Sequence, residues 1–89
     1  MPITKEQYEF LLDWIERNFI HQKTCNYNRN SGSLRSTFEF SPEGFYVDGE
    51  TFKQAMLDCG YVPSSKRGTY WKFNVSEKSP AIRKYYYKD

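Results

Sequence analysis

The side chains best suited to chemistry lie in the stretch SSKRGT, residues 64–69, where two adjacent cations precede a glycine. Lys66 and Arg67 stand in a polar loop between two segments rich in strand-forming residues, 61–62 and 69–75. Lys and Arg side chains that point outward from a loop bind phosphates, and phosphate contacts dominate the affinity of proteins for nucleic acid. The stretch therefore predicts a loop that meets an anionic partner.

Positive charge is concentrated toward the end of the sequence. The whole chain has a formal net charge of +2. Residues 61–89 contain seven Lys or Arg and two Asp or Glu, which gives +5, whereas residues 1–22 give −2 and residues 23–60 give −1. This asymmetry indicates an anionic partner for the basic end. A solvated face that keeps the protein in solution is the alternative interpretation.

The remaining reactive side chains form no catalytic or metal-binding pattern. The single histidine, His21, follows the first apolar segment, and Cys25 and Cys59 match no CxxC or metal-ligand spacing. Neither cysteine has a basic neighbour at the spacing of a nucleophile–base pair. The sequence NSGS lacks the lysine of a phosphate-binding P-loop. We therefore expect a protein that is not an enzyme, with no catalytic residue, no metal and no cofactor.

The same features bear on the setting of the protein. No run of apolar residues approaches the roughly 18 that a membrane span needs. The first residues, MPITKEQYEF, lack the basic and then apolar order of a signal peptide. Together with two widely separated cysteines, this predicts a reduced, cytoplasmic protein without a membrane partner.

Two helices are expected in the first half of the chain. Thr4 to Gln7 has the pattern of a capping box, and the apolar stripe behind it predicts a helix from about residue 5 to 21. The segment SLRSTFEF predicts a short second helix, capped by Ser31 or Ser33 and stopped by Pro42.

A third helix is expected over residues 49–59, with Asp48 as its N-cap and Gly60 at its end. Its buried stripe recurs at helical spacing. The stripe consists of Phe52, Ala55, Met56 and Cys59. By the same periodicity four side chains should point away from the core. These are Thr51, Lys53, Gln54 and Asp58.

Strands complete the expected fold. Residues 69–75 alternate polar and apolar side chains, which predicts one strand of an antiparallel hairpin with its apolar face inward. The run GFYV, residues 44–47, predicts a short third strand. The order of elements predicts an α+β winged helix-turn-helix domain over residues 1–79, with three helices, a small antiparallel sheet and SSKRGT as the wing. Residues 80–89 then form a basic, tyrosine-rich tail.

Three motifs carry a resemblance to a known group of proteins. They are SGSLRSTFE, GFYVDGETFKQAMLDCGYVP and TYWKFNVSEKS, within residues 5–79. In these the chain resembles small uncharacterised proteins of phages and mobile elements of Gram-positive bacteria. Relatives often carry a Lys-His pair where this chain has Arg35-Ser36. The resemblance implies a phage-type winged helix and supplies no activity.

Duplex DNA binding is the leading functional hypothesis. In a winged helix the third helix enters the major groove and the wing reaches the neighbouring backbone. The residues expected to contact phosphates are Lys53, Lys66, Arg67 and Lys72. Thr51 and Gln54 are the expected readers of base edges. Because a net charge of +2 is low for a monomer, a homodimer is the favoured form.

A protein-binding role is the alternative. Winged helices also bind proteins through the same surface, and tyrosine and arginine are favoured at interfaces. The partner would be a host nucleoprotein defence complex, for example a CRISPR nuclease inhibited by this protein. The residues expected at that interface are Arg83, Lys84, Tyr85, Tyr86 and Tyr87.

Overall fold

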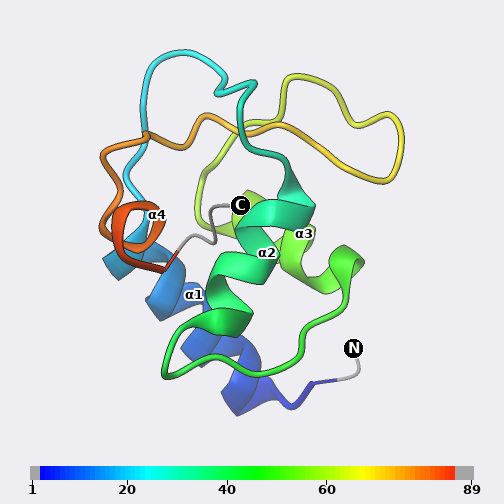
Figure 1. Cartoon of the computed structure of the whole chain (residues 1–89). Coiled ribbons are helices and arrows are strands. Elements are labelled where there is room, and N and C mark those ends of the chain that lie inside the picture. The colour runs from blue at the N-terminus through cyan, green and yellow to red at the C-terminus, as the bar shows by residue number, and fades with distance from the viewer. Residues whose placement is uncertain (1–2, 86–89) are drawn as a thin grey trace.

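Four helices make up the regular structure of residues 3–85. The structure, a computed structural model, describes residues 3–85. The helices are α1 (Lys5–Asn18), α2 (Ser31–Phe40), α3 (Gly49–Asp58) and α4 (Pro80–Tyr85). Figure 1 shows α1, α2 and α3 gathered below two long loops, and α4 packs against α2. Among the described residues, the helices are too short and too polar for any of them to cross a bilayer.

Capping chemistry sets the start of α1, as the sequence predicts. The Thr4 hydroxyl accepts a hydrogen bond from the Gln7 backbone N–H at 3.0 Å, and the Gln7 side chain accepts from the Thr4 N–H at 2.9 Å. The helix ends at Asn18, three residues before the predicted end, because Phe19 adopts an extended conformation. Asn18 donates from its side chain to the Trp14 carbonyl at 2.9 Å, which satisfies one of the last carbonyls.

The other helix ends confirm one predicted cap and correct another. Asn30, not Ser31 or Ser33, is the N-cap of α2, and it forms a reciprocal capping box with Ser33. The predicted cap of α3 is confirmed, since the Asp48 carboxylate accepts from the Thr51 N–H. Gly60 has φ +86°, the left-handed conformation expected after a helix.

Aromatic rings fill the core between the helices, where α1 and α2 both contact α3 and α2 contacts α4. The Trp14 ring packs edge-on against Phe38 and Phe19, with centroids 4.9 and 5.4 Å away. Phe38 in turn packs edge-on against Phe45 at 5.0 Å. Each such ring removes about 150–250 Å² from water, so a few aromatics stabilise this small domain.

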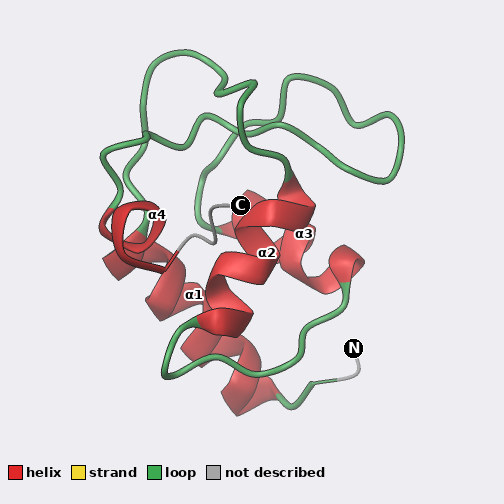
Figure 2. Cartoon of the chain, viewed as in Figure 1, coloured by secondary structure: helices red, strands yellow, loops and turns green. Residues whose placement is uncertain are grey.

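The predicted antiparallel sheet is absent from residues 3–85, and the α+β winged helix-turn-helix assignment is therefore wrong. Figure 2 shows helices and loops in this part of the chain. Two isolated antiparallel bridges, His21 with Val75 and Pro63 with Phe73, stand in place of a ladder. The molecule is mostly helical.

Specific residues interrupt the hairpin. Pro63 has no N–H to donate, so the pairing with Phe73 cannot extend as a regular ladder. The N–H of the preceding residue, Val62, donates to the side chain of Asn74 at 2.8 Å and not to a backbone carbonyl. The predicted alternation of side chains is nevertheless present, because Phe73 and Val75 are fully buried.

Residues 44–47, predicted as a strand, form a loop that closes back on α2. Gly44 donates to the Ser41 carbonyl at 3.0 Å in a turn. A Cβ at position 44 would lie 2.0 Å from the Phe38 carbonyl oxygen, so the close approach requires glycine. Of this segment Val47 is fully buried, while Tyr46 is exposed.

The segment predicted as a tail begins with α4. Pro80 occupies the first position of this helix, where a missing N–H has no consequence. Ala81 and Ile82 are buried in the same core as the other helices. The hydroxyl of Ser79, also buried, accepts from the Ile20 N–H at 2.7 Å and ties α4 to the segment after α1.

The two long loops lie together and are called the loop layer, defined as residues 20–30 and 60–79. Backbone hydrogen bonds join them at Gln22 to Asn74, Asn26 to Phe73 and Ser76 to Ile20, all between 2.7 and 3.0 Å. Figure 1 shows this layer across the top of the helices.

Candidate nucleic-acid interface

Lys66 and Arg67 lie at the exposed tip of the loop between residues 64 and 69, as expected. Gly68 has φ +78°, which reverses the chain there, and its carbonyl accepts from the Trp71 indole N–H at 3.2 Å. The Arg67 backbone N–H donates to the Ser65 hydroxyl at 3.2 Å. Neither cationic side chain has a partner within the described part of the chain, so both are available to an external anion.

Lys53 is buried, and its expected outward orientation is wrong. Its side chain is 5% exposed. The amine lies 2.8 Å from a Glu50 carboxylate oxygen, donates to the Thr69 carbonyl at 3.0 Å and stands 4.5 Å from the centroid of the Trp71 ring. The loop layer folds over this side of α3, which the helical period alone does not reveal. Lys53 therefore fastens the loop layer to α3 and is not placed to contact phosphate.

Of the two residues on α3 that were expected to read base edges, one is buried and the other is exposed. Thr51 is buried next to the N-cap, so its expected exposure is also wrong. Gln54 is exposed, and its side chain donates to Asp58 at 2.8 Å. With Thr51 and Lys53 buried, α3 does not present the basic surface that entry into a major groove requires.

Lys72 lies close to the other loop. Its amine donates to the Tyr27 carbonyl at 3.2 Å, and its side chain is partly exposed. Two further cations of the loop layer, Lys23 and Lys78, are exposed and were missing from the predicted site. Neither side chain has a partner among residues 3–85. Lys23 is distant in sequence from the basic end, and only the fold places its loop beside residues 61–75.

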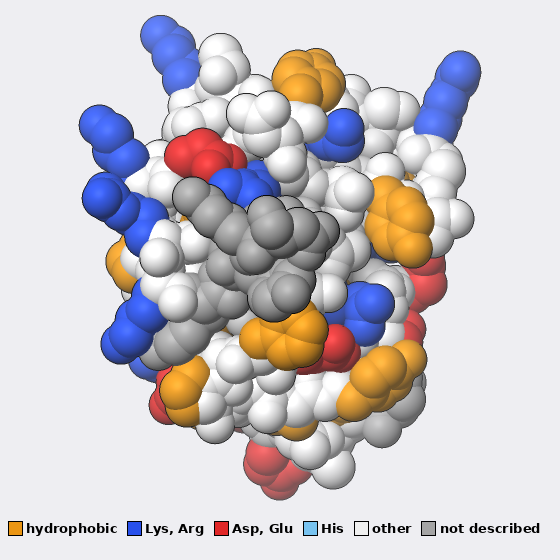
Figure 3. All heavy atoms as spheres, viewed as in Figure 1, with side chains coloured by type: hydrophobic (Ala, Val, Ile, Leu, Met, Phe, Trp, Pro, Cys, Tyr) orange, Lys and Arg blue, Asp and Glu red, His pale blue; other side chains and the backbone are white. Residues whose placement is uncertain are grey.

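Charge is strongly segregated between the loop layer and the part of the chain that forms α1, α2 and α3. The loop layer contains six Lys or Arg and one carboxylate, a net charge of +5. That carboxylate, Glu77, is held by two hydrogen bonds from Arg29, at 2.6 and 2.8 Å. Residues 3–19 and 31–59 contain four cations and nine carboxylates, a net charge of −5. In Figure 3, Lys and Arg side chains project along the top and left of the molecule, over the loops and α4.

A groove runs between the two loops of this layer. It encloses about 340 Å³, and its lining residues are Lys23, Cys25, Tyr27, Val62, Pro63, Ser64 and Asn74. The Asn74 side chain joins the two walls, because its amide accepts from the Val62 N–H and donates to the Gln22 carbonyl at 3.0 Å. Tyr27 and Val62 are 67% and 63% exposed, so the groove has an apolar rim within a basic surface.

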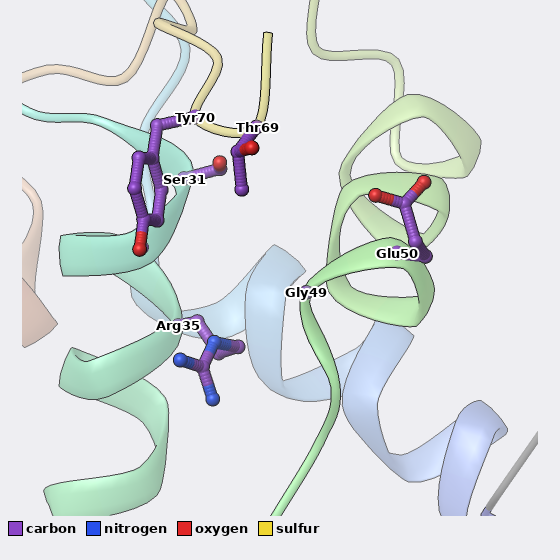
Figure 4. Close-up of a pocket in the computed structure, with 7 residues that line it drawn as sticks. Ser31, Arg35, Gly49, Glu50, Thr69 and Tyr70 are labelled. Atoms are coloured by element: carbon purple, nitrogen blue, oxygen red, sulfur yellow. The ribbon is translucent and has the colours of Figure 1, made fainter.

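A second, smaller cavity of about 170 Å³ lies between the starts of α2 and α3. Figure 4 shows the Arg35 guanidinium between α2 and Gly49, with Tyr70 and Thr69 at the other side of the opening. Arg35 donates to a Glu39 carboxylate oxygen at 3.0 Å and to the Val47 carbonyl at 3.1 Å. These bonds connect α2 to the segment before α3, so Arg35 has a structural task here.

Among residues 3–85, His21 and Cys59 make packing contacts and do not form a catalytic pair. The imidazole of His21 stacks on the buried Tyr61 ring, with centroids 3.7 Å apart. Burial raises the pKa of the Cys59 thiol to about 11, so the thiol stays protonated at neutral pH. Its sulfur is 3.5 Å from the Leu12 carbonyl oxygen. Among residues 3–85, no cluster of His, Cys, Asp and Glu could hold a metal ion.

The surface expected for a protein partner is described in part. Arg83 and Lys84 are exposed on α4. Tyr85 belongs to α4, whereas Tyr86 and Tyr87 lie outside the described residues.

No family model, curated protein or solved structure matches this chain. The resemblance to small phage proteins stays a prediction from the sequence.

Proposed function

We propose that this protein binds nucleic acid through the loop layer, chiefly by contact with phosphates. The observation that supports this most is the composition of that layer, with six cations and a single carboxylate that Arg29 already neutralises. The five other cations are Lys23, Lys66, Arg67, Lys72 and Lys78. Contacts of this kind supply most of the non-specific affinity for nucleic acid.

The mode of binding differs from the one that the sequence suggested. Duplex DNA, the predicted ligand, would meet the loops and not α3, because Lys53 and Thr51 are buried. The carboxylates of the helical end would repel the same phosphates, which orients the ligand toward the loop layer. Phosphate contacts read no sequence, so the expected binding is tolerant of sequence.

Binding of a labelled random-sequence duplex, measured by fluorescence anisotropy at low salt, tests the proposal. We expect Lys66→Glu to weaken binding and Lys66→Glu with Arg67→Glu to remove most of it, because each exchange turns an attraction into a repulsion. Lys5→Glu, a single charge reversal at an exposed position of α1, is the matched control and should keep most of the affinity. A wild-type protein that binds neither duplex nor single strand at low ionic strength would refute the proposal. The protein-partner alternative would then be tested by capture experiments with Arg83 and Lys84 reversed in charge.

A further inference from the structure

The groove between the two loops has the features of a site for an unpaired base. We propose that a single-stranded nucleic acid binds across the loop layer with one base in this groove, stacked on Tyr27. The inference rests on the proposed function, since the phosphate contacts deliver the strand, and it specifies which form of nucleic acid the layer prefers.

The rim of the groove carries the first argument. Tyr27 and Val62 are large apolar side chains that remain 67% and 63% exposed in the most cationic part of the molecule. An exposed aromatic ring within a basic groove is the arrangement by which proteins bind single strands, because every base offers a π-face for stacking. Such stacking is worth about 1–3 kcal/mol per base when the aromatic side chain is removed.

The floor of the groove carries the second argument. Asn74 is tied to both walls, through the Val62 N–H and the Gln22 carbonyl, so its amide shapes the groove and is occupied in doing so. Ser64 at one wall donates its backbone N–H to the Lys72 carbonyl at 2.9 Å. The walls are therefore held at a fixed separation by the protein itself. A base that enters can stack on Tyr27, while the Asn74 amide is already engaged with the protein, so recognition should be tolerant of sequence.

Cations on both sides of the groove carry the third argument. Lys23 lines one wall, and the Lys72 amine is bonded to the carbonyl of Tyr27 itself. Lys66 and Arg67 follow Ser64, at the opposite wall, by two and three residues. A strand whose base lies on Tyr27 would thus have phosphates near positive charge on either side. In a duplex the bases are paired and stacked inside, so the groove would stay empty and only the phosphate contacts would form.

The test compares an oligothymidine of about 16 nucleotides, within the range of known site sizes, with a duplex of equal length at the same salt concentration. We expect the single strand to bind more tightly to the wild-type protein. Tyr27→Ala should weaken binding of the single strand by about 10-fold, the equivalent of the stacking contribution, and leave the duplex affinity unchanged. Tyr27→Trp should retain the single-strand affinity. Tyr46→Ala, which removes an equally exposed ring outside the loop layer, is the control and should change neither affinity.

The position of the strand can be checked independently of affinity. Cys25 lines the groove, whereas Cys59 contacts the Leu12 carbonyl at the α1–α3 side. Bound oligothymidine should slow the alkylation of Cys25 by iodoacetamide, followed by mass spectrometry, and leave Cys59 unaffected. If the wild-type protein binds both ligands equally and Tyr27→Ala binds oligothymidine normally, the inference is wrong and the proposed function stands. If Lys66→Glu with Arg67→Glu leaves both affinities intact, the proposed function fails as well.

Discussion

At the scale of single residues, the partners of a side chain decide its use more than its type does. Lys53 and Lys66 are both lysines that the sequence predicts to contact phosphates. The amine of Lys53 has a carboxylate, a carbonyl and an aromatic face as partners, whereas Lys66 is exposed at the tip of its loop. Burying an amine is tolerated only with such compensation. A lysine that is compensated in this way holds the fold, and an exposed one remains for a ligand.

Asp48 gives a residue-scale prediction. Hydrogen bonds from Thr51, of which the one from its side chain has the largest effect, lower the pKa of Asp48 below its ordinary value. Burial acts in the opposite direction but has a smaller effect. Asp48→Ala should lower the free energy of unfolding by about 0.5–2 kcal/mol at pH 7, measured by urea denaturation, whereas Asp48→Asn should retain most of it, since Asn caps equally well.

The pH dependence follows from the direction of that pKa shift. A lowered folded-state pKa adds stability above the unfolded pKa of about 3.9, and this stability is lost as the pH falls through the lower folded pKa. The stability of the wild-type protein should therefore decline toward that of Asp48→Ala below pH about 4. A stability difference between them that persists undiminished at lower pH would show that the carboxylate charge contributes nothing.

At the scale of elements, the sequence predicts what local chemistry determines. Capping patterns and apolar stripes in the sequence correctly predict three helices, because each of these patterns involves residues that are three or four positions apart. The sheet was predicted wrongly because Pro63 removes a donor and the Asn74 side chain takes the place of a backbone partner. Non-local packing explains the burial of Lys53 beneath the loop layer and the groove that pairs Tyr27 with Val62. The sequence feature that could have indicated the groove is Tyr27, an aromatic residue close to Lys23 in a polar loop.

The fourth helix gives a prediction at this scale. Ile82 is 6% exposed and belongs to the common core, although the sequence placed it in a tail. Ile82→Ala should lower the free energy of unfolding by about 2–5 kcal/mol, because it removes buried methyl groups and leaves a cavity. Arg83→Ala, at the adjacent exposed position, should change it by less than about 0.5 kcal/mol. Equal, small effects of the two substitutions in urea denaturation would mean that α4 is not part of the cooperative fold.

At the scale of the whole molecule, the fold sorts charge that the sequence leaves mixed. The net charge of +2 conceals +5 in the loop layer and −5 in residues 3–19 and 31–59, with residues 80–89 contributing the remaining +2. Two loops from different parts of the chain supply the positive layer, and the carboxylates lie mainly on the helices. Such an arrangement orients the approach of a polyanion and raises its rate of association at low salt. A monomer can therefore present a strongly basic surface despite a modest total charge.

The salt dependence of binding measures this layer directly. The logarithm of the affinity for a single strand falls with the logarithm of salt concentration by about 0.7 for each phosphate neutralised. Five cations outside the Arg29–Glu77 pair set an upper bound of about 3.5 on that slope. Lys23→Ala and Lys78→Ala, at separate positions in the layer, should each flatten the slope by about 0.7, and their effects should add. Lys5→Ala, on α1, should leave it unchanged. A slope near zero for the wild-type protein, or equal flattening by all three variants, would mean that the loop layer does not contact phosphates.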